Sequence, residues 1–358
     1  MDPGLSRLRR GPSGGSNLPT PIASDPADHT LRETMLAGAQ NVQAGELHPT
    51  IVVATTIYVV ALGASALLKV RADVLNAVPL CIGPGAFLCL YSRIAFPHAL
   101  RITRLIEATF IVIVLGLSLA CLSYLGAMAD LPLRDREMMW IDHHFGFDWL
   151  QMMQALDRRP LLLVVLDGAY ATFTSQLIGT VLVLILAGRT RELDRFCLTF
   201  VCTSVMAEVC SVFAPTLGPM SAAGGHADFA HLPTLGRTTA EIVLNLRDGT
   251  LRAIDLDAIN GIISFPSLHA AVSVIVPFSL RWNRALFWPI ATLDAVMLVS
   301  AVPSGNHYLV DVIGGVGVGT LAILCSGPIQ TSVDRLVHLA PRVARSRAAL
   351  DGQSPGIS

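Results

Sequence analysis

The chain has 358 residues, of which 53% are hydrophobic and 14% are charged, and its formal net charge is -1. A soluble globular protein carries about 25% charged residues. This composition therefore excludes a soluble globular fold, and its high apolar content excludes a disordered chain. The near-zero net charge provides no basic surface for nucleic acid. We expect an all-α, polytopic membrane protein.

The N-terminal region is polar and has no sustained hydrophobic period. Residues 1–46 are rich in Gly, Pro, Ser and Asp, which predicts a disordered cytoplasmic tail. The arginines at its start are followed by Gly, Pro and Ser rather than by an apolar run, so we do not expect a cleaved signal peptide.

Apolar runs long enough to cross a bilayer as helices, about 20 residues each, occupy most of the remaining chain. Eight are predicted, near 50–68, 74–92, 106–128, 161–187, 196–214, 266–283, 285–303 and 308–326. The first two spans lie in 47–105 and the other six in 106–326, and a cytoplasmic tail is expected in 327–358. The 7 cysteines lie inside these runs without C-x-x-C spacing, which indicates packing rather than metal binding.

Two longer segments separate these runs. The first, 129–160, mixes tryptophans, phenylalanines and methionines with charges, which predicts an interfacial helix over 135–157. Its Asp142-His143-His144 triplet resembles a metal cluster, but adjacent residues on a helix point apart. The second segment, 215–265, is polar and rich in Gly and Thr.

The distribution of basic residues predicts the orientation, because cytoplasmic loops carry an excess of Lys and Arg. The two tails share one side with Arg93, Arg101, Arg104, Arg189, Arg191, Arg195, Arg281 and Arg284. Fewer basic residues lie on the other side. We therefore expect both termini in the cytoplasm, and 129–160, 215–265 and 303–307 on the outer face.

Two histidines begin spans on that outer face. His269 opens the sixth run after Pro266-Ser267, and His307 opens the eighth, four residues before Asp311. On a helix, positions 307 and 311 share a face, so the carboxylate can fix one imidazole nitrogen and leave the other as a nucleophile. His269 across a cleft can then serve as acid and base. Each histidine alone is also compatible with a simple interfacial hydrogen bond.

Two further features of this region bear on the same chemistry. Ser267 and Gly305 lie in turns that precede helices, where backbone N–H groups and hydroxyls can hold a phosphate. A second interpretation uses His269, His307 and Asp311 as metal ligands, although no other residue of the loop has obvious ligand spacing. The first interpretation needs no cofactor and no metal.

The two histidine segments also resemble a known family. Phe-Pro-Ser-Leu-His-Ala-Ala at 265–271 and Gly-Asn-His-Tyr-Leu-Val-Asp at 305–311 are similar to two signature motifs of the type 2 phosphatidic acid phosphatase superfamily, closest to its inositol phosphorylceramide synthase-like branch. The segment 213–219 resembles the end of an earlier core helix in that branch. The resemblance implies a six-helix core in which His307 forms a phosphohistidine, Asp311 orients it and His269 transfers protons.

The sequence departs from the superfamily pattern in its cations. The lysine of the first motif is not recognisable, and the third motif has Ala301 where an arginine is common. Because phosphoryl transfer needs positive charge around the phosphate oxygens, we expect Arg237, Arg247 and Arg252 of the polar segment to supply it. Each of these arginines is also compatible with an ordinary solvated loop charge.

Other features of the spans suggest packing or an alternative function. The glycines of 314–319 are predicted to permit close helix packing rather than nucleotide binding, because no strand precedes them. Asp167, Glu208 and Asp294 lie inside spans, where ionisable residues are costly and usually functional. They keep open a non-catalytic lipid carrier or a proton-coupled transporter.

The sequence thus predicts a metal-independent phosphoric ester hydrolase or phosphotransferase of the membrane. Its expected substrate is a lipid phosphate or phospholipid at the outer face, with water or a lipid or sugar hydroxyl as the acceptor. Lys69 is the only lysine among the 25 Lys and Arg residues, and alanine is abundant. This usage is typical of GC-rich bacterial genomes, so we expect a bacterial inner membrane with the active site facing the periplasm.

Overall fold

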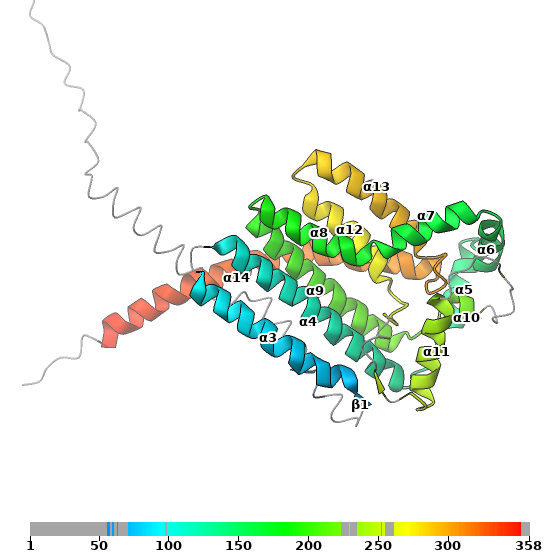
Figure 1. Cartoon of the computed structure of the whole chain (residues 1–358), viewed down its shortest axis with the longest axis horizontal. Helices are drawn as coiled ribbons and strands as arrows, with labels where there is room; N and C mark the ends of the chain where they lie inside the picture. Colours follow the sequence, from blue (N-terminus) through cyan, green and yellow to red (C-terminus); the bar gives the residue numbers. More distant parts are fainter. Residues whose placement is uncertain are drawn as a thin grey trace, which may run out of the picture. The chain divides into compact units, whose positions relative to one another are not determined.

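A computed structural model describes residues 56–57, 59–60, 63, 71–96, 99–222, 229, 235–251, 253–254 and 261–351. Only the backbone is described at 71–83, 100, 235–237, 253–254, 333–334 and 336–351. The predicted tail 1–46 and most of the first predicted span lie outside the described residues. The described part is almost entirely helical, as expected for the all-α class (Figure 1).

Among the described residues, three helices have the length and composition to cross a membrane: α4 (Leu100–Met128), α9 (Thr190–Phe213) and the N-terminal part of α14 (Leu309–Asp351). A fourth span is formed by the bent pair α7 (Pro160–Ala171) and α8 (Phe173–Leu186). The chain is therefore a multi-pass membrane protein. These four helices correspond to the runs predicted at 106–128, 196–214, 308–326 and 161–187.

The predicted span 161–187 is not one straight helix. It bends by 47° between α7 and α8. Thr172 lies at the break, and its hydroxyl donates a hydrogen bond of 2.6 Å to the carbonyl of Ala169. A Thr side chain that bonds the preceding turn competes with the helical ladder and bends the helix. Hydropathy does not detect this bend because both halves are equally apolar.

Shorter helices follow on either side of the main spans. The runs predicted at 266–283 and 285–303 form α12 (Leu268–Leu280) and α13 (Arg284–Ser300), and the run at 74–92 lies in α3 (Asp73–Ala95). Asn283 caps α13 by accepting a hydrogen bond of 3.0 Å from Ala285 N–H. The turn before it reverses the chain, so that α13 lies beside α12 (Figure 1).

The expected interfacial helix over 135–157 is two helices, α5 (Asp135–His144) and α6 (Trp149–Asp157). Gly146 in the turn between them has φ +74°, a conformation that favours glycine. Asp148 then caps α6 by accepting a hydrogen bond of 2.9 Å from Gln151 N–H. The long polar segment holds α10 (Pro219–Ala222) and α11 (Leu235–Arg247). Its strand β2 (Ala253–Ile254) pairs in parallel with β1 (Arg71–Ala72).

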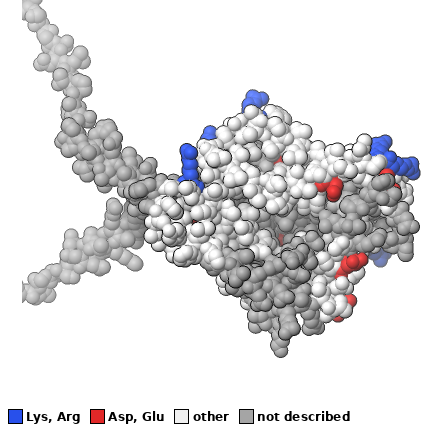
Figure 2. Space-filling model, viewed as in Figure 1, with Lys and Arg blue, Asp and Glu red and all other residues white. Residues whose placement is uncertain are grey.

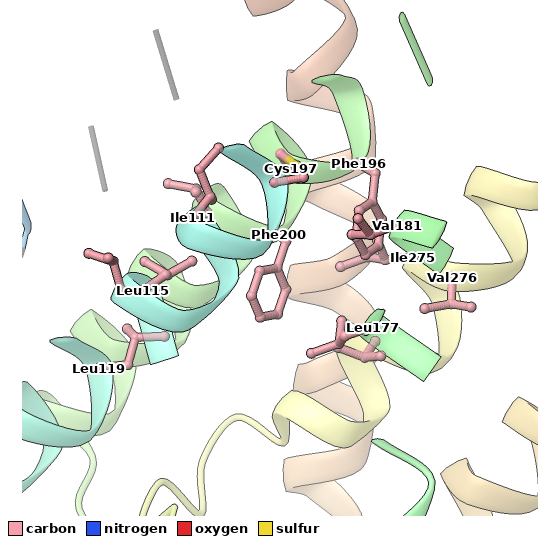
Figure 3. Close-up of a cluster of buried hydrophobic side chains, with 14 of the residues drawn as sticks. Ile111, Leu115, Leu119, Leu177, Val181, Phe196, Cys197, Phe200, Ile275 and Val276 are labelled. Atoms are coloured by element: carbon pink, nitrogen blue, oxygen red, sulfur yellow. The ribbon is translucent and has the colours of Figure 1, made fainter. Parts of the chain in front are cut away.

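The main hydrophobic core lies where α4, α8, α9 and α12 meet. Figure 3 shows Ile111, Leu115 and Leu119 in successive turns of α4, facing the neighbouring helices. Phe196 and Phe200 of α9 are buried in the same cluster. Cys197 is also buried there, as predicted, whereas Cys325 is exposed.

The outer surface of the helices is strongly apolar. Leu161, Leu186, Phe213 and Leu324 are between 65% and 83% exposed. Such exposure of large apolar side chains is expected where lipid, not water, is the solvent. On the face shown in Figure 2, charged residues gather near the two ends and leave a broad uncharged band between them.

The basic ends of several helices meet at one end of the bundle. Arg104 lies 3.9 Å from Asp194, and Arg195 donates a 3.0 Å hydrogen bond to the carbonyl of Ile323. The Arg189 guanidinium lies 4.7 Å from the ring of Trp282. Arginines predicted to share one side of the membrane therefore lie together, at the ends of α9 and α12 opposite to the two histidine motifs.

Candidate active site

His307 lies in the turn between α13 and α14 and is only 2% exposed. Its Nδ1 is 2.9 Å from the backbone carbonyl oxygen of Ser264. A carbonyl oxygen can only accept, so Nδ1 carries the proton and Nε2 keeps its lone pair. Burial lowers the pKa of His307 to about 4, which keeps the ring neutral. This is the protonation state that a nucleophile needs.

Asp311 does not bond His307 directly. Its Oδ2 is 3.9 Å from Nδ1 of the imidazole, beyond hydrogen-bond distance. The two residues were expected to share one face of a helix. They do not, because α14 begins at Leu309 and His307 lies in the turn before it. Asp311 instead accepts from the N–H of Tyr308 at 2.8 Å and from the hydroxyl of Ser264 at 3.0 Å. It is therefore connected to His307 through Ser264, whose carbonyl accepts the hydrogen bond from the ring.

His269 faces His307 from the first turn of α12. The two ring centroids are 6.2 Å apart, with 58° between the ring planes. The His269 ring stacks on Tyr170, with 3.8 Å between centroids and 11° between planes, and it also contacts Phe173 at 4.4 Å. Tyr170 and Phe173 lie on either side of the α7–α8 break. The bend therefore places two aromatic rings around His269.

Close packing between α12 and α14 brings the two histidines together. Gly315 lies so close to the carbonyl of Ser267 that any Cβ there would overlap it. One turn later, a Cβ on Gly319 would lie 2.7 Å from the carbonyl oxygen of Ala271. The prediction that this glycine run permits close helix packing is confirmed. Larger residues would separate the helices that carry the two histidines.

The predicted motif at 213–219 meets the same loop. Gly218 has φ +90°, and a Cβ there would lie 2.8 Å from the carbonyl oxygen of Asn306. Gly305 has φ +83°, and a Cβ there would lie 2.7 Å from Met220. Both glycines are required by close approach as well as by conformation. The three segments singled out in the sequence thus converge, although they lie far apart in the chain.

The proposed phosphate ligands are placed differently from one another. Ser267 is fully buried, its hydroxyl accepts from Ala270 N–H at 3.3 Å, and its own N–H donates to the carbonyl of Asp311 at 3.0 Å. The hydroxyl thus caps α12, and the N–H connects α12 to α14. Gly305 lies in the turn that leads to His307, and its carbonyl accepts from Met220 N–H at 3.3 Å.

The three candidate arginines are not brought to the histidines in the part of the chain that the structure describes. Arg247 at the end of α11 forms an ion pair of 2.6 Å with Asp130. The Arg237 side chain and the whole of Arg252 lie outside the described residues. Their role as phosphate ligands stays a prediction.

Two aspartates of α5, not identified from the sequence as site residues, contact the His307 turn. Asp142 accepts from the N–H groups of Leu309 at 2.8 Å and Val310 at 2.9 Å. Asp135 accepts from the Tyr308 hydroxyl at 2.9 Å. The sequence signal is their seven-residue spacing, which places both on one face of a helix.

Burial raises the pKa of both α5 carboxyls above the ordinary range, and the hydrogen bonds that they accept oppose this rise. Beside them lies a cavity of about 200 Å³, lined by residues that include Asp142, Trp149 and Tyr308. Neither His269 nor His307 lines this cavity.

The acidic residues of the alternative function lie on three different helices. Asp294 on α13 is 1% exposed and lies beside Gln176 of α8. Glu208 on α9 is 6% exposed, whereas Asp167 on α7 is exposed. Among the described residues, no group of three or more His, Cys, Asp or Glu side chains has the arrangement of a metal site.

Residues 136–325 match the family model described as the PAP2 superfamily. No curated protein and no solved structure matches the chain. The matched segment runs from α5 into α14 and includes both histidines and Asp311, whereas α3 and α4 precede it. This segment covers more than half of the 358 residues, so the chain belongs to the PAP2 superfamily, and its activity is of the phosphatase type on lipid phosphates.

Proposed function

We propose that the protein transfers the phosphoryl or phosphodiester group of a membrane lipid through a covalent intermediate on His307. The observation that carries this proposal is the hydrogen bond from Nδ1 of His307 to the carbonyl of Ser264. It leaves the Nε2 lone pair free on a neutral ring that faces His269. The 6.2 Å between ring centroids suits one phosphoryl group between an attacking nitrogen, about 3 Å away, and a proton donor at hydrogen-bond distance.

In the first step, Nε2 of His307 attacks phosphorus and forms an N–P bond. The P–O bond to the leaving alcohol breaks, its electron pair goes to oxygen, and His269 donates a proton to that oxygen. In the second step, His269 removes a proton from water or from an acceptor hydroxyl. The new oxygen bonds phosphorus, the N–P bond breaks, and its electron pair returns to Nε2 of His307.

The position of the site in the helix bundle supports a lipid as the substrate. His269 and His307 lie at the starts of two apolar helices, next to the bend of the α7–α8 span. A phosphate at this depth can remain attached to acyl chains that stay in the bilayer. The arginines at the opposite end of the bundle support an outward-facing site under the positive-inside rule.

Transfer to a hydroxyl acceptor, as in the inositol phosphorylceramide synthase-like branch, is the more specific form of this proposal. Pro-Ser-Leu-His at 266–269 and His-Tyr-x-x-Asp at 307–311 support it, as does Ala301 in place of a common arginine. Ala301 is completely buried in an apolar cluster with Trp149 and Val302, a position in which an unpaired arginine would be costly.

The decisive experiment measures phosphate release from phosphatidic acid by the purified protein in detergent with EDTA present. We expect release by the wild type, none by His307→Ala, and wild-type release by His143→Ala, a change at an exposed histidine of α5. Thermal stability in detergent confirms that the inactive variant is folded. Release by folded His307→Ala would refute the mechanism.

If the wild type releases no phosphate, the same proteins are tested for phosphodiester transfer from a phospholipid to a lipid hydroxyl. Transfer that depends on His307 supports the synthase form. A protein that moves lipid or protons and needs Asp294 but not His307 is instead a carrier or transporter, since Asp294 is a buried carboxyl within a span.

A further inference from the structure

The helix that carries Asp311 begins without a cap of its own. The first N–H groups of a helix have no partner inside it, and a Ser, Thr, Asp or Asn just before the helix normally accepts from them. The residue before α14 is Tyr308, whose side chain cannot reach back in this way. The N–H groups of Leu309 and Val310 are satisfied by Asp142, 167 and 168 positions earlier in the chain.

Asp142 therefore acts as a cap supplied by another helix. Its two oxygens each accept one N–H, at 2.8 and 2.9 Å, and the side chain is 3% exposed. A carboxylate at this position also interacts favourably with the positive end of the helix dipole. Such charge-assisted bonds are stronger than neutral ones. The start of α14, two residues after His307, is thus held by α5.

Asp135, two turns earlier on the same face of α5, holds the other side of the turn. Its Oδ1 accepts from the Tyr308 hydroxyl at 2.9 Å and from the N–H groups of Leu217 at 2.9 Å and Gly218 at 3.0 Å. Gly218 in turn packs against the carbonyl of Asn306. Asp135 therefore connects both neighbours of His307, directly through Tyr308 and indirectly through Gly218.

A third contact comes from the next helix. The indole N–H of Trp149 in α6 donates a 3.0 Å hydrogen bond to the carbonyl of Val302, at the start of the same turn. The residues from Val302 to Tyr308 lie between α13 and α14, so no helical ladder fixes them. Contacts from α5 and α6 take the place of that ladder.

We propose that α5 is a positioning element for the reaction, and that Asp135 and Asp142 fix the turn so that Nε2 of His307 points at the substrate phosphorus. The proposal rests on the function proposed above, because it assumes that His307 is the nucleophile. Neither aspartate touches the reacting atoms. Their contribution is the geometry of attack, where an error of about 1 Å can cost a hundredfold in rate.

The test compares Asp142→Asn, Asp135→Asn and Tyr308→Phe with a matched control, Glu137→Gln. Glu137 lies on the same helix, is exposed, and contacts Arg134 at 3.1 Å. Tyr308→Phe removes only the hydroxyl that Asp135 accepts from, so it keeps the proposal testable if an aspartate variant does not fold. Each protein is purified in detergent and its melting temperature is recorded.

The first readout is independent of activity. Hydrogen exchange of the peptide that contains residues 308–310, followed by mass spectrometry, should become roughly tenfold faster in Asp142→Asn, because each lost charge-assisted bond exposes an amide. Glu137→Gln should exchange like the wild type. Unchanged exchange in Asp142→Asn would show that Asp142 does not hold the start of α14, whatever the protein's activity.

The second readout separates positioning from general stability. For the wild-type reaction identified above, kcat should fall roughly tenfold to a hundredfold in the aspartate variants and less in Tyr308→Phe, with KM unchanged. If exchange accelerates while kcat stays within twofold of wild type, α5 is structural only. If the wild type has no His307-dependent turnover, the proposed function fails. The exchange result still decides whether Asp142 holds the start of α14.

Discussion

Nδ1 of His307 donates a 2.9 Å hydrogen bond to the backbone carbonyl of Ser264, although the two residues are 43 positions apart. The Ser264 hydroxyl contacts Asp311 Oδ2 at 3.0 Å and the carbonyl of Asn306 at 2.5 Å. Ser264 thus connects the imidazole to the carboxylate that the sequence places four residues after it. Asp311 and His307 are therefore connected through a third residue rather than by a direct bond.

This connection predicts that Ser264 and Asp311 act as one unit. Ser264→Ala keeps the carbonyl that holds His307 but removes the hydroxyl that reaches Asp311, so we expect kcat to fall about tenfold, the value of a hydrogen bond to a charged group. Asp311→Asn should cost more, because it also weakens the bond from Tyr308 N–H. The double variant should be no slower than Asp311→Asn alone. A double-mutant cycle measures this, and fully additive losses would contradict the connection.

Burial lowers the pKa of His307 to about 4, and this value predicts how the reaction rate falls at acidic pH. The nucleophile is neutral above this value and protonated below it, so formation of the covalent intermediate should decline only as the pH falls through about 4. The measurement uses a lipid p-nitrophenyl phosphodiester, whose leaving group needs no proton from His269. The burst of nitrophenol is recorded from pH 7 downward. A decline centred near 6.5, the ordinary value for histidine, would show that the ring is not shielded from water.

The stack of Tyr170 on His269 predicts a specific pattern of substitutions. Tyr170→Phe keeps the ring, whereas Tyr170→Leu removes the aromatic face that lies 3.8 Å from the imidazole. We expect near-wild-type KM in both and a larger loss of kcat in Tyr170→Leu, because the stacked ring holds the His269 imidazole in place. The Tyr170 hydroxyl lies beside Asn306 and Ser304, so Tyr170→Phe should show a small loss. Equal activity of the Phe and Leu variants would show that the stack of Tyr170 on His269 does not contribute to the reaction.

The glycines of α14 predict a difference in stability. Gly315→Ala places a methyl group against the carbonyl of Ser267, and backbone cannot move aside easily, so we expect poor expression or a clearly lower melting temperature in detergent. Gly317→Ala is the matched control, because a Cβ there meets no atom within 4 Å and alanine favours the helix. A Gly315→Ala protein as stable as Gly317→Ala would mean that the two helices are less closely packed.

The fold class and the close helix packing are local information that the sequence predicts, and the structure confirms both. The hydropathy of the chain determined the all-α membrane class, because each span must satisfy its own backbone and be apolar over its length. His269 and His307 were selected by their positions in turns that precede apolar helices. The glycine spacing of 314–319 predicts close packing, because small residues let two helix backbones approach.

Only the tertiary structure determined how these parts act on one another. The partners of Ser264, Asp135 and Asp142 lie 42 to 173 positions away in the chain, so neighbouring residues do not identify them. The bend at Thr172 is equally hidden, since both halves of that span have the same hydropathy. Burial then determines the protonation state of His307, because the cost of charging an imidazole depends on the atoms packed around it rather than on its neighbours in the chain.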